Sequence, residues 1–155
     1  MIKNAVIAGT FDPVTIGHLD IIKRASEMFG RVYVGIFENT QKNTMFSAKT
    51  RYDAMCAAVK DLENVFVEEA GNTTLSDFAA AHSAVIVKGI RNGVDADYEI
   101  SLAGINKQIG NIETVILPTS PELSFISSTF VRDMIKYEKP YEKYVPSGVP
   151  EILAK

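Results

Sequence analysis

Residues 9–18 read Gly9-Thr10-Phe11-Asp12-Pro13-Val14-Thr15-Ile16-Gly17-His18 and join a short apolar run to an amphipathic stretch. Gly9 allows the backbone to approach a ligand, and Asp12-Pro13 favours a turn. Thr15 is suited to cap the following helix, with His18 in its first turn. Free amides at a helix N-terminus beside an imidazole predict a phosphate site. The alternative is that His18 is a surface residue beside a cap, but its place between a strand and a helix favours the phosphate site.

Short apolar runs alternate with amphipathic stretches along the rest of the chain, which is the pattern of βαβ units. The expected strands are 4–8, 31–37, 64–68, 84–88 and 114–117. Five parallel strands with right-handed crossovers predict an α/β fold with a Rossmann-like, doubly wound sheet and helices on both faces. In such sheets a ligand binds beyond the carboxyl ends of the strands where the strand order reverses. We therefore expect the site between the first and fourth strands.

The helices between these strands carry apolar side chains at a spacing of three and four residues. One is expected from about Asp95, with Tyr98, Leu102, Ile105 and Ile109 facing the core. At roughly 150 residues per domain, a chain of 155 residues predicts a single domain spanning 1–155. The Pro- and Tyr-rich segment from about 138 to 155 is expected to pack on this domain as an extension.

Composition excludes several classes of protein. The 16 Lys and Arg against 19 Asp and Glu give a net charge of −3, which argues against a nucleic-acid binder. Cys56 is the single cysteine, so an intrachain disulfide is impossible, and no His or Cys pattern predicts a zinc site. Because no apolar run approaches the roughly 18 residues of a membrane span, we expect a cytoplasmic protein with no membrane partner.

The loop after the fourth strand carries two cations around a glycine, Lys88-Gly89-Ile90-Arg91. Lys88 ends an apolar strand, so its charge needs either an anionic ligand or a salt bridge, for which Asp95 or Asp97 is the nearest candidate. Glu99, further along, is either part of the site or a surface carboxylate. This loop alone does not decide between a ligand site and a structural ion pair.

The segment after the fifth strand opens a helix with Ser127-Ser128-Thr129, followed one turn later by Arg132. In isolation these hydroxyls are more often helix caps than ligand contacts. Lys42, after the second strand, is by composition a solvated loop lysine. Three polar loops that converge on one crevice nevertheless predict a phosphorylated ligand.

The motifs Thr15-x-Gly17-His18 and Ile126-Ser127-Ser128-Thr129-x-x-Arg132 resemble the (His/Thr)-x-Gly-His and Ile-Ser-Ser-Thr-x-x-Arg signatures of the nucleotidylyltransferase superfamily. Two further segments, 89–99 and 124–128, make the chain similar to the phosphopantetheine adenylyltransferase family in particular. The resemblance covers nearly the whole chain. It departs from the family pattern at Lys88, where Arg is more frequent, and at Leu123, where an aromatic residue is common.

This resemblance implies transfer of the adenylyl group of ATP to 4′-phosphopantetheine, giving dephospho-coenzyme A and pyrophosphate. The catalytic residues that it implies are Thr10, His18, Lys42 and Arg91. The implied ATP contacts are Thr10, Phe11, His18, Gly89, Ile90, Arg91, Glu99, Leu123, Ser124, Phe125, Ile126, Ser127, Ser128 and Thr129. The implied phosphopantetheine contacts are Thr10, Lys42, Thr74, Leu75, Lys88, Tyr98, Leu102 and Asn106.

The resemblance also implies Mg²⁺ arriving with ATP, feedback binding of coenzyme A, and a homohexamer. Two other functions remain open on the residues. One is a related nucleotidylyltransferase with another phosphorylated acceptor, such as nicotinate mononucleotide or glycerol 3-phosphate. The other is a nucleotide sensor without catalytic activity, against which the intact Thr10, His18, Lys42 and Arg91 argue.

Overall fold

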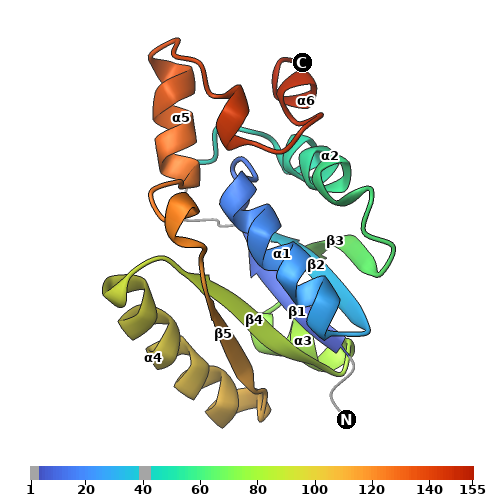
Figure 1. The fold of residues 1–155 in the computed structure, drawn as a ribbon. Coiled ribbons are helices and arrows are strands. Elements are labelled where there is room, and N and C mark those ends of the chain that lie inside the picture. Colours follow the sequence, from blue (N-terminus) through green and yellow to red (C-terminus); the bar gives the residue numbers. More distant parts are fainter. Residues whose placement is uncertain (1–3, 39–42) are drawn as a thin grey trace.

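The computed structural model describes residues 4–38 and 43–155, and its centre is a parallel sheet of five strands (Figure 1). The strand order is β3-β2-β1-β4-β5, so the direction of winding reverses between β1 and β4. In β1, Val6 pairs with Tyr33 of β2 on one side and with Ile86 of β4 on the other. The strands are β1 (Asn4–Gly9), β2 (Arg31–Phe37), β3 (Val65–Gly71), β4 (Ala84–Ile90) and β5 (Thr114–Pro118). This arrangement confirms the predicted fold class and the position of the crevice.

Helices follow the strands in alternation and cover both faces of the sheet. The α-helices are α1 (Ile16–Met28), α2 (Ala48–Val59), α3 (Leu75–Ala81), α4 (Gly93–Gly110), α5 (Ser128–Lys136) and α6 (Pro150–Leu153). Two short 3-10 helices, η1 (Pro121–Leu123) and η2 (Glu142–Tyr144), lie in the C-terminal third. Figure 1 shows α1 in front of the sheet and α3 behind it.

The two faces of β1 belong to two separate hydrophobic clusters, because successive side chains of a strand point to opposite faces. Ala5 and Ile7 pack in the larger cluster, together with the buried residues of α1 and α2. Val6 packs in the smaller cluster with Phe78 of α3. The central strands β1, β2 and β4 contain buried residues on both faces, as their continuous apolar sequence predicts, whereas the edge strands β3 and β5 are partly exposed.

Helix α4 differs from its prediction. It begins at Gly93 rather than near Asp95, and none of its residues is buried. Tyr98, Ile105 and Ile109, expected in the core, are 63%, 52% and 67% exposed. The apolar periodicity of α4 is real, but among the described elements α4 packs mainly against α3, β4 and β5, at one edge of the sheet. A periodic stripe shows that a helix has an apolar face and does not show what covers it.

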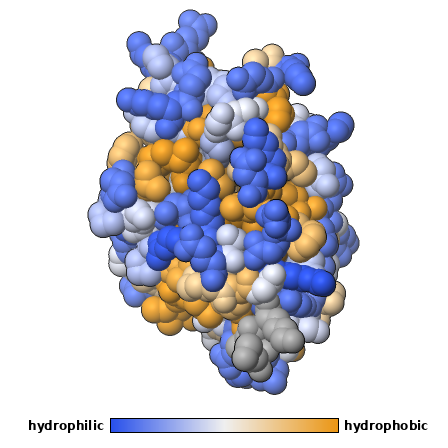
Figure 2. All heavy atoms as spheres, turned by 45° about the vertical axis from the view of Figure 1, so that its right-hand side comes forward, coloured by the Kyte–Doolittle hydropathy of each residue, from blue (hydrophilic) through white to orange (hydrophobic). Residues whose placement is uncertain are grey.

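The C-terminal segment packs against the larger cluster, to which Val145 and Val149 contribute fully or almost fully buried side chains. Figure 1 shows α6 beside α2 at the carboxyl edge of the sheet. Figure 2 turns the right-hand side of that view forward and shows hydrophilic residues over most of this face, with apolar atoms in separate patches. Among the described residues, no helix combines the length and apolar character needed to cross a membrane.

Candidate active site

A cavity of about 430 Å³ opens beyond the carboxyl ends of β1 and β4, where the strand order reverses. Its wall is formed by the ends of these two strands, the loops that follow them, and the N-termini of α1, α4 and α5. The structure therefore brings together the three polar loops that the sequence singled out. The predicted site residues in its wall are Thr10, Phe11, His18, Lys88, Gly89, Arg91, Tyr98, Glu99, Ile126, Ser127, Ser128 and Thr129.

Other predicted site residues lie outside this wall. They are Thr74, Leu75, Ile90, Leu102, Asn106, Leu123, Ser124 and Phe125. Thr74 caps α3 by accepting a hydrogen bond from the amide of Asp77, and Phe125 is 60% exposed. Lys42 lies outside the described residues. For all of these, contact with a ligand stays a prediction.

His18 is held by a reciprocal cap at the N-terminus of α1. The Thr15 hydroxyl accepts a hydrogen bond from the His18 amide, and the Thr15 amide donates to Nδ1 of His18 across 3.0 Å. The Thr15 Oγ1 also lies 3.2 Å from the same nitrogen. Because a backbone N–H only donates, Nδ1 must be an acceptor, and the proton of the neutral ring is therefore assigned to Nε2.

The imidazole of His18 is uncharged at neutral pH. Burial of the ring, and secondarily the charge of Arg91, lowers the pKa of His18 to about 4. The ring of Phe11 packs edge-to-face against it, with centroids 5.1 Å apart. The Phe11 side chain is only 5% exposed, so it supports the imidazole of His18 and offers a ligand little more than its backbone. That backbone has a positive φ of 48°. His18 is thus a fixed neutral donor, and its Nε2–H, which has no hydrogen-bond partner within residues 4–38 and 43–155, can donate to a ligand oxygen.

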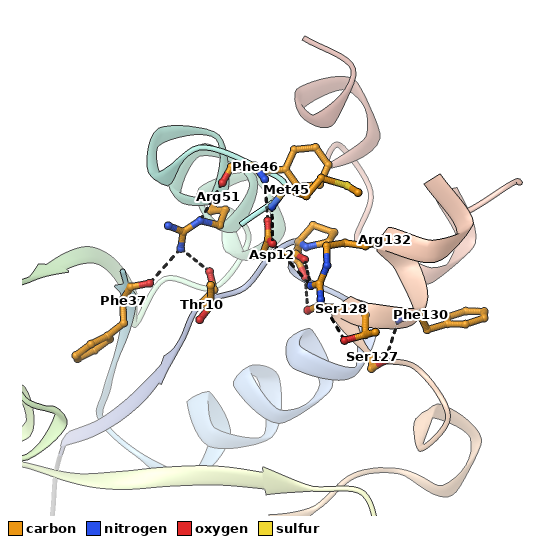
Figure 3. Close-up of polar contacts among 12 residues, drawn as sticks. Thr10, Asp12, Phe37, Met45, Phe46, Arg51, Ser127, Ser128, Phe130 and Arg132 are labelled. Carbon is orange, nitrogen blue, oxygen red and sulfur yellow. Dashed lines mark hydrogen bonds and ion pairs between the residues drawn. The ribbon is translucent and has the colours of Figure 1, made fainter. Parts of the chain in front are cut away.

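The start of α5 is tied to the loop after β1. Ser128 Oγ donates to the carbonyl of Pro13 across 2.8 Å, and Nη1 of Arg132 donates to the carbonyl of Asp12 across 2.7 Å (Figure 3). Ser127 is the N-cap of α5 and accepts from the amide of Phe130. The capping interpretation is therefore confirmed for Ser127. Ser128 and Arg132 hold the two chain segments in register at the cavity.

The wall from β4 and α4 contains two cations, and each faces a carboxylate. Nζ of Lys88 lies 3.5 Å from Oε2 of Glu99, an oxygen that is buried and accepts no hydrogen bond among the described residues. Glu99 is therefore a cavity residue and not a surface carboxylate. Of the two alternatives for Lys88, a salt bridge to Asp95 or Asp97 is wrong in its partner, because the carboxylate beside Lys88 is that of Glu99 and Asp95 pairs with Arg91.

Arg91 forms a two-pronged ion pair with Asp95, one turn further on. Nε and Nη2 of Arg91 donate to the two carboxylate oxygens across 2.9 and 3.2 Å, and the Arg91 amide donates to Oδ2. These hydrogen bonds lower the pKa of Asp95 and raise that of Arg91. The pair is partly exposed, at 38% and 25%, so it is a weak interaction that an anionic ligand can replace.

Two residues that position the site were not identified from the sequence. The carboxylate of Asp12 accepts from the amides of Met45 and Phe46, across 2.8 and 2.9 Å (Figure 3). Arg51 of α2 is 2% exposed and donates to the carbonyl of Thr10. One signal was available: Arg51 stands four residues before Met55, on the face of α2 that the apolar periodicity predicts to be buried.

The chain is similar over most of its length to known proteins. Residues 6–134 match the cytidylyltransferase-like family model. A phosphopantetheine adenylyltransferase of Streptococcus agalactiae is 44% identical over 151 residues, which cover 96% of this chain and 94% of the relative. An enzyme of the same name from Psychromonas ingrahamii is 39% identical over 153 residues, with coverage of 97% and 94%.

A comparison of structures agrees on the fold. A solved structure of a proposed nicotinate-nucleotide adenylyltransferase from Vibrio parahaemolyticus superposes with a TM-score of 0.71 over the full length of both chains. Its sequence is 23% identical, so this similarity concerns the fold alone. Sequence identity near 40% over almost the whole chain is specific, and this chain therefore belongs to the phosphopantetheine adenylyltransferase family of cytidylyltransferase-like proteins.

Proposed function

We propose that this chain transfers the adenylyl group of ATP to 4′-phosphopantetheine, producing dephospho-coenzyme A and pyrophosphate. Its relatives at 38–44% identity carry the name of this enzyme. The structural observation that carries the proposal is the cavity itself, in which a neutral imidazole donor faces two cations. Such a site matches a reaction between two polyanions. The names of the relatives favour neither a nucleotidylyltransferase with another acceptor nor a nucleotide sensor without catalytic activity.

In this reaction an oxygen of the acceptor phosphate forms a bond to the α-phosphorus of ATP. The bond from that phosphorus to the bridging oxygen breaks, and pyrophosphate leaves with the electron pair. A phosphate monoester has a second pKa of about 6, so the nucleophile is already ionised at neutral pH. The site consequently needs no general base, and catalysis depends on alignment and on stabilising charge at the α-phosphate.

The chain's residues supply these two functions from opposite sides of the cavity. We assign the Nε2–H of His18, together with Thr10, to the α-phosphate, where negative charge develops. Arg91, once released from Asp95, binds the leaving phosphates, and Lys42 is proposed to contact the phosphates of both substrates. Lys88 binds the acceptor phosphate as a point charge, because an ammonium lacks the planar fork of the more frequent arginine.

The remaining substrate contacts follow the family assignment. Adenine and ribose are proposed to lie along residues 123–129, which lead from η1 into α5. The pantetheine arm is proposed to run along α4 past Tyr98, Leu102 and Asn106, toward Thr74 and Leu75. Tyr98 lies in the cavity wall, and Asn106 of α4 lies beside Ser76 of α3. With these contacts, the two substrates are proposed to lie on either side of His18.

Mg²⁺ is proposed to enter with ATP rather than on a set of protein ligands. Both oxygens of Asp12 accept backbone amides, and those of Asp95 face Arg91. Within residues 4–38 and 43–155, His, Cys, Asp and Glu form no cluster of three suited to a metal ion. The residues fit a metal carried on phosphate oxygens, where it would neutralise charge on the triphosphate.

A homohexamer is proposed from the family resemblance, and the exposed apolar face of α4 supports self-association. Val94, Tyr98, Ile105 and Ile109 follow one another at helical spacing on one side of α4 and are 79%, 63%, 52% and 67% exposed. Exposed apolar surface of this kind marks interaction sites. Light scattering should then give a mass six times the 17.0 kDa of one chain.

Feedback binding of coenzyme A in the same cavity and a cytoplasmic location are also proposed, on the same family resemblance.

The decisive test is pyrophosphate release from ATP with each acceptor in turn. We expect release with 4′-phosphopantetheine and none above background with nicotinate mononucleotide or glycerol 3-phosphate. Addition of EDTA should abolish the release, and excess Mg²⁺ should restore it. Release with another acceptor only, or ATP binding without any release, would contradict the proposal.

A further inference from the structure

Arg51 is a buried cation that lacks a carboxylate partner. It is 2% exposed, and no carboxylate of the described part of the chain forms an ion pair with it. The residues outside that part, 1–3 and 39–42, contain no Asp or Glu. The arginines that do form ion pairs, Arg24, Arg91 and Arg132, each face an aspartate. These three arginines are all partly exposed, and Arg31, which forms no ion pair among the described residues, is exposed, so Arg51 is the one arginine that is both buried and without a carboxylate partner.

The guanidinium of Arg51 holds three segments of backbone together. Nη1 donates to the carbonyls of Thr10 and Phe37 across 2.7 and 3.1 Å, and Nε donates to the carbonyl of Phe46 across 3.3 Å (Figure 3). Thr10 lines the cavity, Phe37 ends β2, and Phe46 precedes α2. The planar fork of an arginine can satisfy such a set of acceptors at fixed angles, whereas a lysine cannot.

A buried charge without a counter-ion is costly, and hydrogen bonds to carbonyls relieve only part of the cost. The charge of Arg51 lies directly behind Thr10, and a polyanion in the cavity would supply the opposite charge that the protein omits. Burial also shields the guanidinium from water and salt, so its field acts on the cavity more strongly than that of a surface cation.

We propose that Arg51 is a positioning residue of the active site with two separable effects. Its hydrogen bonds fix Thr10 for the reaction, and its unpaired charge favours binding of the triphosphate. The inference rests on the proposed adenylyl transfer for the first effect only. The second effect concerns any polyphosphate and holds independently of the acceptor.

Two substitutions separate the effects. Arg51→Lys keeps the charge and loses the fork, so kcat for pyrophosphate release should fall about tenfold or more because Thr10 is misplaced. The Kd for ATP and for inorganic tripolyphosphate should stay within about twofold of the wild type. Arg51→Met loses both the charge and the fork, so kcat should fall at least as far as in Arg51→Lys. Tripolyphosphate should then bind roughly tenfold more weakly than to the wild type.

A purely structural role would lower the melting temperature of both variants without changing kcat or Kd per folded molecule. Wild-type kcat in Arg51→Lys, or wild-type tripolyphosphate affinity in a folded Arg51→Met, would overturn the proposal. If Arg51→Met does not fold, Arg51→Lys still decides the positioning effect, and Arg51→Gln replaces it in the binding experiment. Arg24→Met is the matched control, because Arg24 also donates to a carbonyl, that of Pro118, and lies outside the cavity wall.

The experiment distinguishes failure of this inference from failure of the proposed function. If the wild type releases no pyrophosphate with phosphopantetheine, the function is wrong, and tripolyphosphate binding still tests the charge of Arg51. If the wild type is active and both variants match it, the function stands and the role of Arg51 is wrong.

Discussion

The two walls of the cavity differ in how their polar groups are prepared for a ligand. The β1–α1 wall presents His18 as a neutral donor, fixed by two groups of Thr15 and by the ring of Phe11. The β4–α4 wall presents Lys88 and Arg91, which face Glu99 and Asp95. One wall is ready before a ligand arrives, and the other must exchange its partners when the ligand binds.

This difference divides the chemistry between the walls. A donor that is already oriented costs no reorganisation when charge develops in a transition state, so the β1–α1 wall is suited to catalysis. A cation that leaves a carboxylate to bind a phosphate gains only the difference in free energy between two similar ion pairs. The β4–α4 wall is therefore suited to binding and releasing the phosphates of the substrates. Substitutions in the first wall should therefore change kcat, and those in the second should change affinity.

The largest effect is expected from His18→Ala. Loss of one preorganised donor to the α-phosphate should lower kcat at least about a hundredfold, because such donors contribute a few kcal/mol to the transition state. The Kd for ATP should change little, since the cations and backbone amides remain. Steady-state pyrophosphate release together with calorimetric ATP binding measures both quantities.

The control for this substitution is His82→Ala. His82 stacks on Tyr33 with centroids 3.9 Å apart and lies 3.1 Å from Glu68, outside the cavity wall. Its removal should lower the melting temperature and leave kcat unchanged. Near-normal turnover in His18→Ala, or an equal loss in His82→Ala, would rule out the catalytic assignment.

A smaller effect of opposite sign is expected from Asp95→Asn in the second wall. With the competing charge removed, Arg91 should bind phosphate more readily, and ATP affinity should rise about threefold, as suits a partly exposed ion pair. Stability should fall slightly, because Asp95 is the acidic residue in the first turn of α4. Calorimetric titration and thermal unfolding measure the two changes.

Asp53→Asn provides the matched comparison, since Asp53 pairs with Lys49 at the same spacing on α2, outside the cavity wall. It should leave ATP affinity unchanged. Weaker ATP binding in Asp95→Asn would mean that Asp95 orients Arg91 for the ligand instead of competing with it.

The sequence predicted the parts of the fold and site that depend on local pattern. The order of strands and helices, the Thr15 and Ser127 caps, and the meeting of three loops all follow from periodicity, capping residues and the topology of parallel sheets. The partners of individual charges did not follow. Lys88 faces Glu99 rather than Asp95 because Asp95, in the first turn of α4, forms its ion pair with Arg91.

Two further features lay beyond the sequence for a physical reason. The apolar stripe of α4 predicts burial, but coverage of Ile105 and Ile109 depends on neighbours that the strand order supplies only on one side. Arg51 joins carbonyls of Thr10, Phe37 and Phe46, and backbone acceptors leave no mark on residue type. Interactions with backbone and contacts between distant segments are thus the parts that required the structure.

The smallest expected effect concerns the charge of His18, which should not change in mild acid, and it sharpens the contrast between the two walls. His18 should remain neutral, with its proton on Nε2, from pH 8 down to about pH 5, since burial lowers its pKa to about 4. Nitrogen-15 NMR of the imidazole resonances distinguishes the two tautomers and the protonated ring.

In the unfolded chain the same ring takes up a proton near its ordinary pKa of 6.5. The unfolded state therefore binds more protons between about pH 6.5 and 4, and the free energy of unfolding should fall as the pH drops through that range. A ring that titrates near 6.5 in the folded protein would become a cation in mild acid, and a neutral ring with its proton on Nδ1 would leave Nε2 without a proton to donate. Either result would remove the distinction between the two walls.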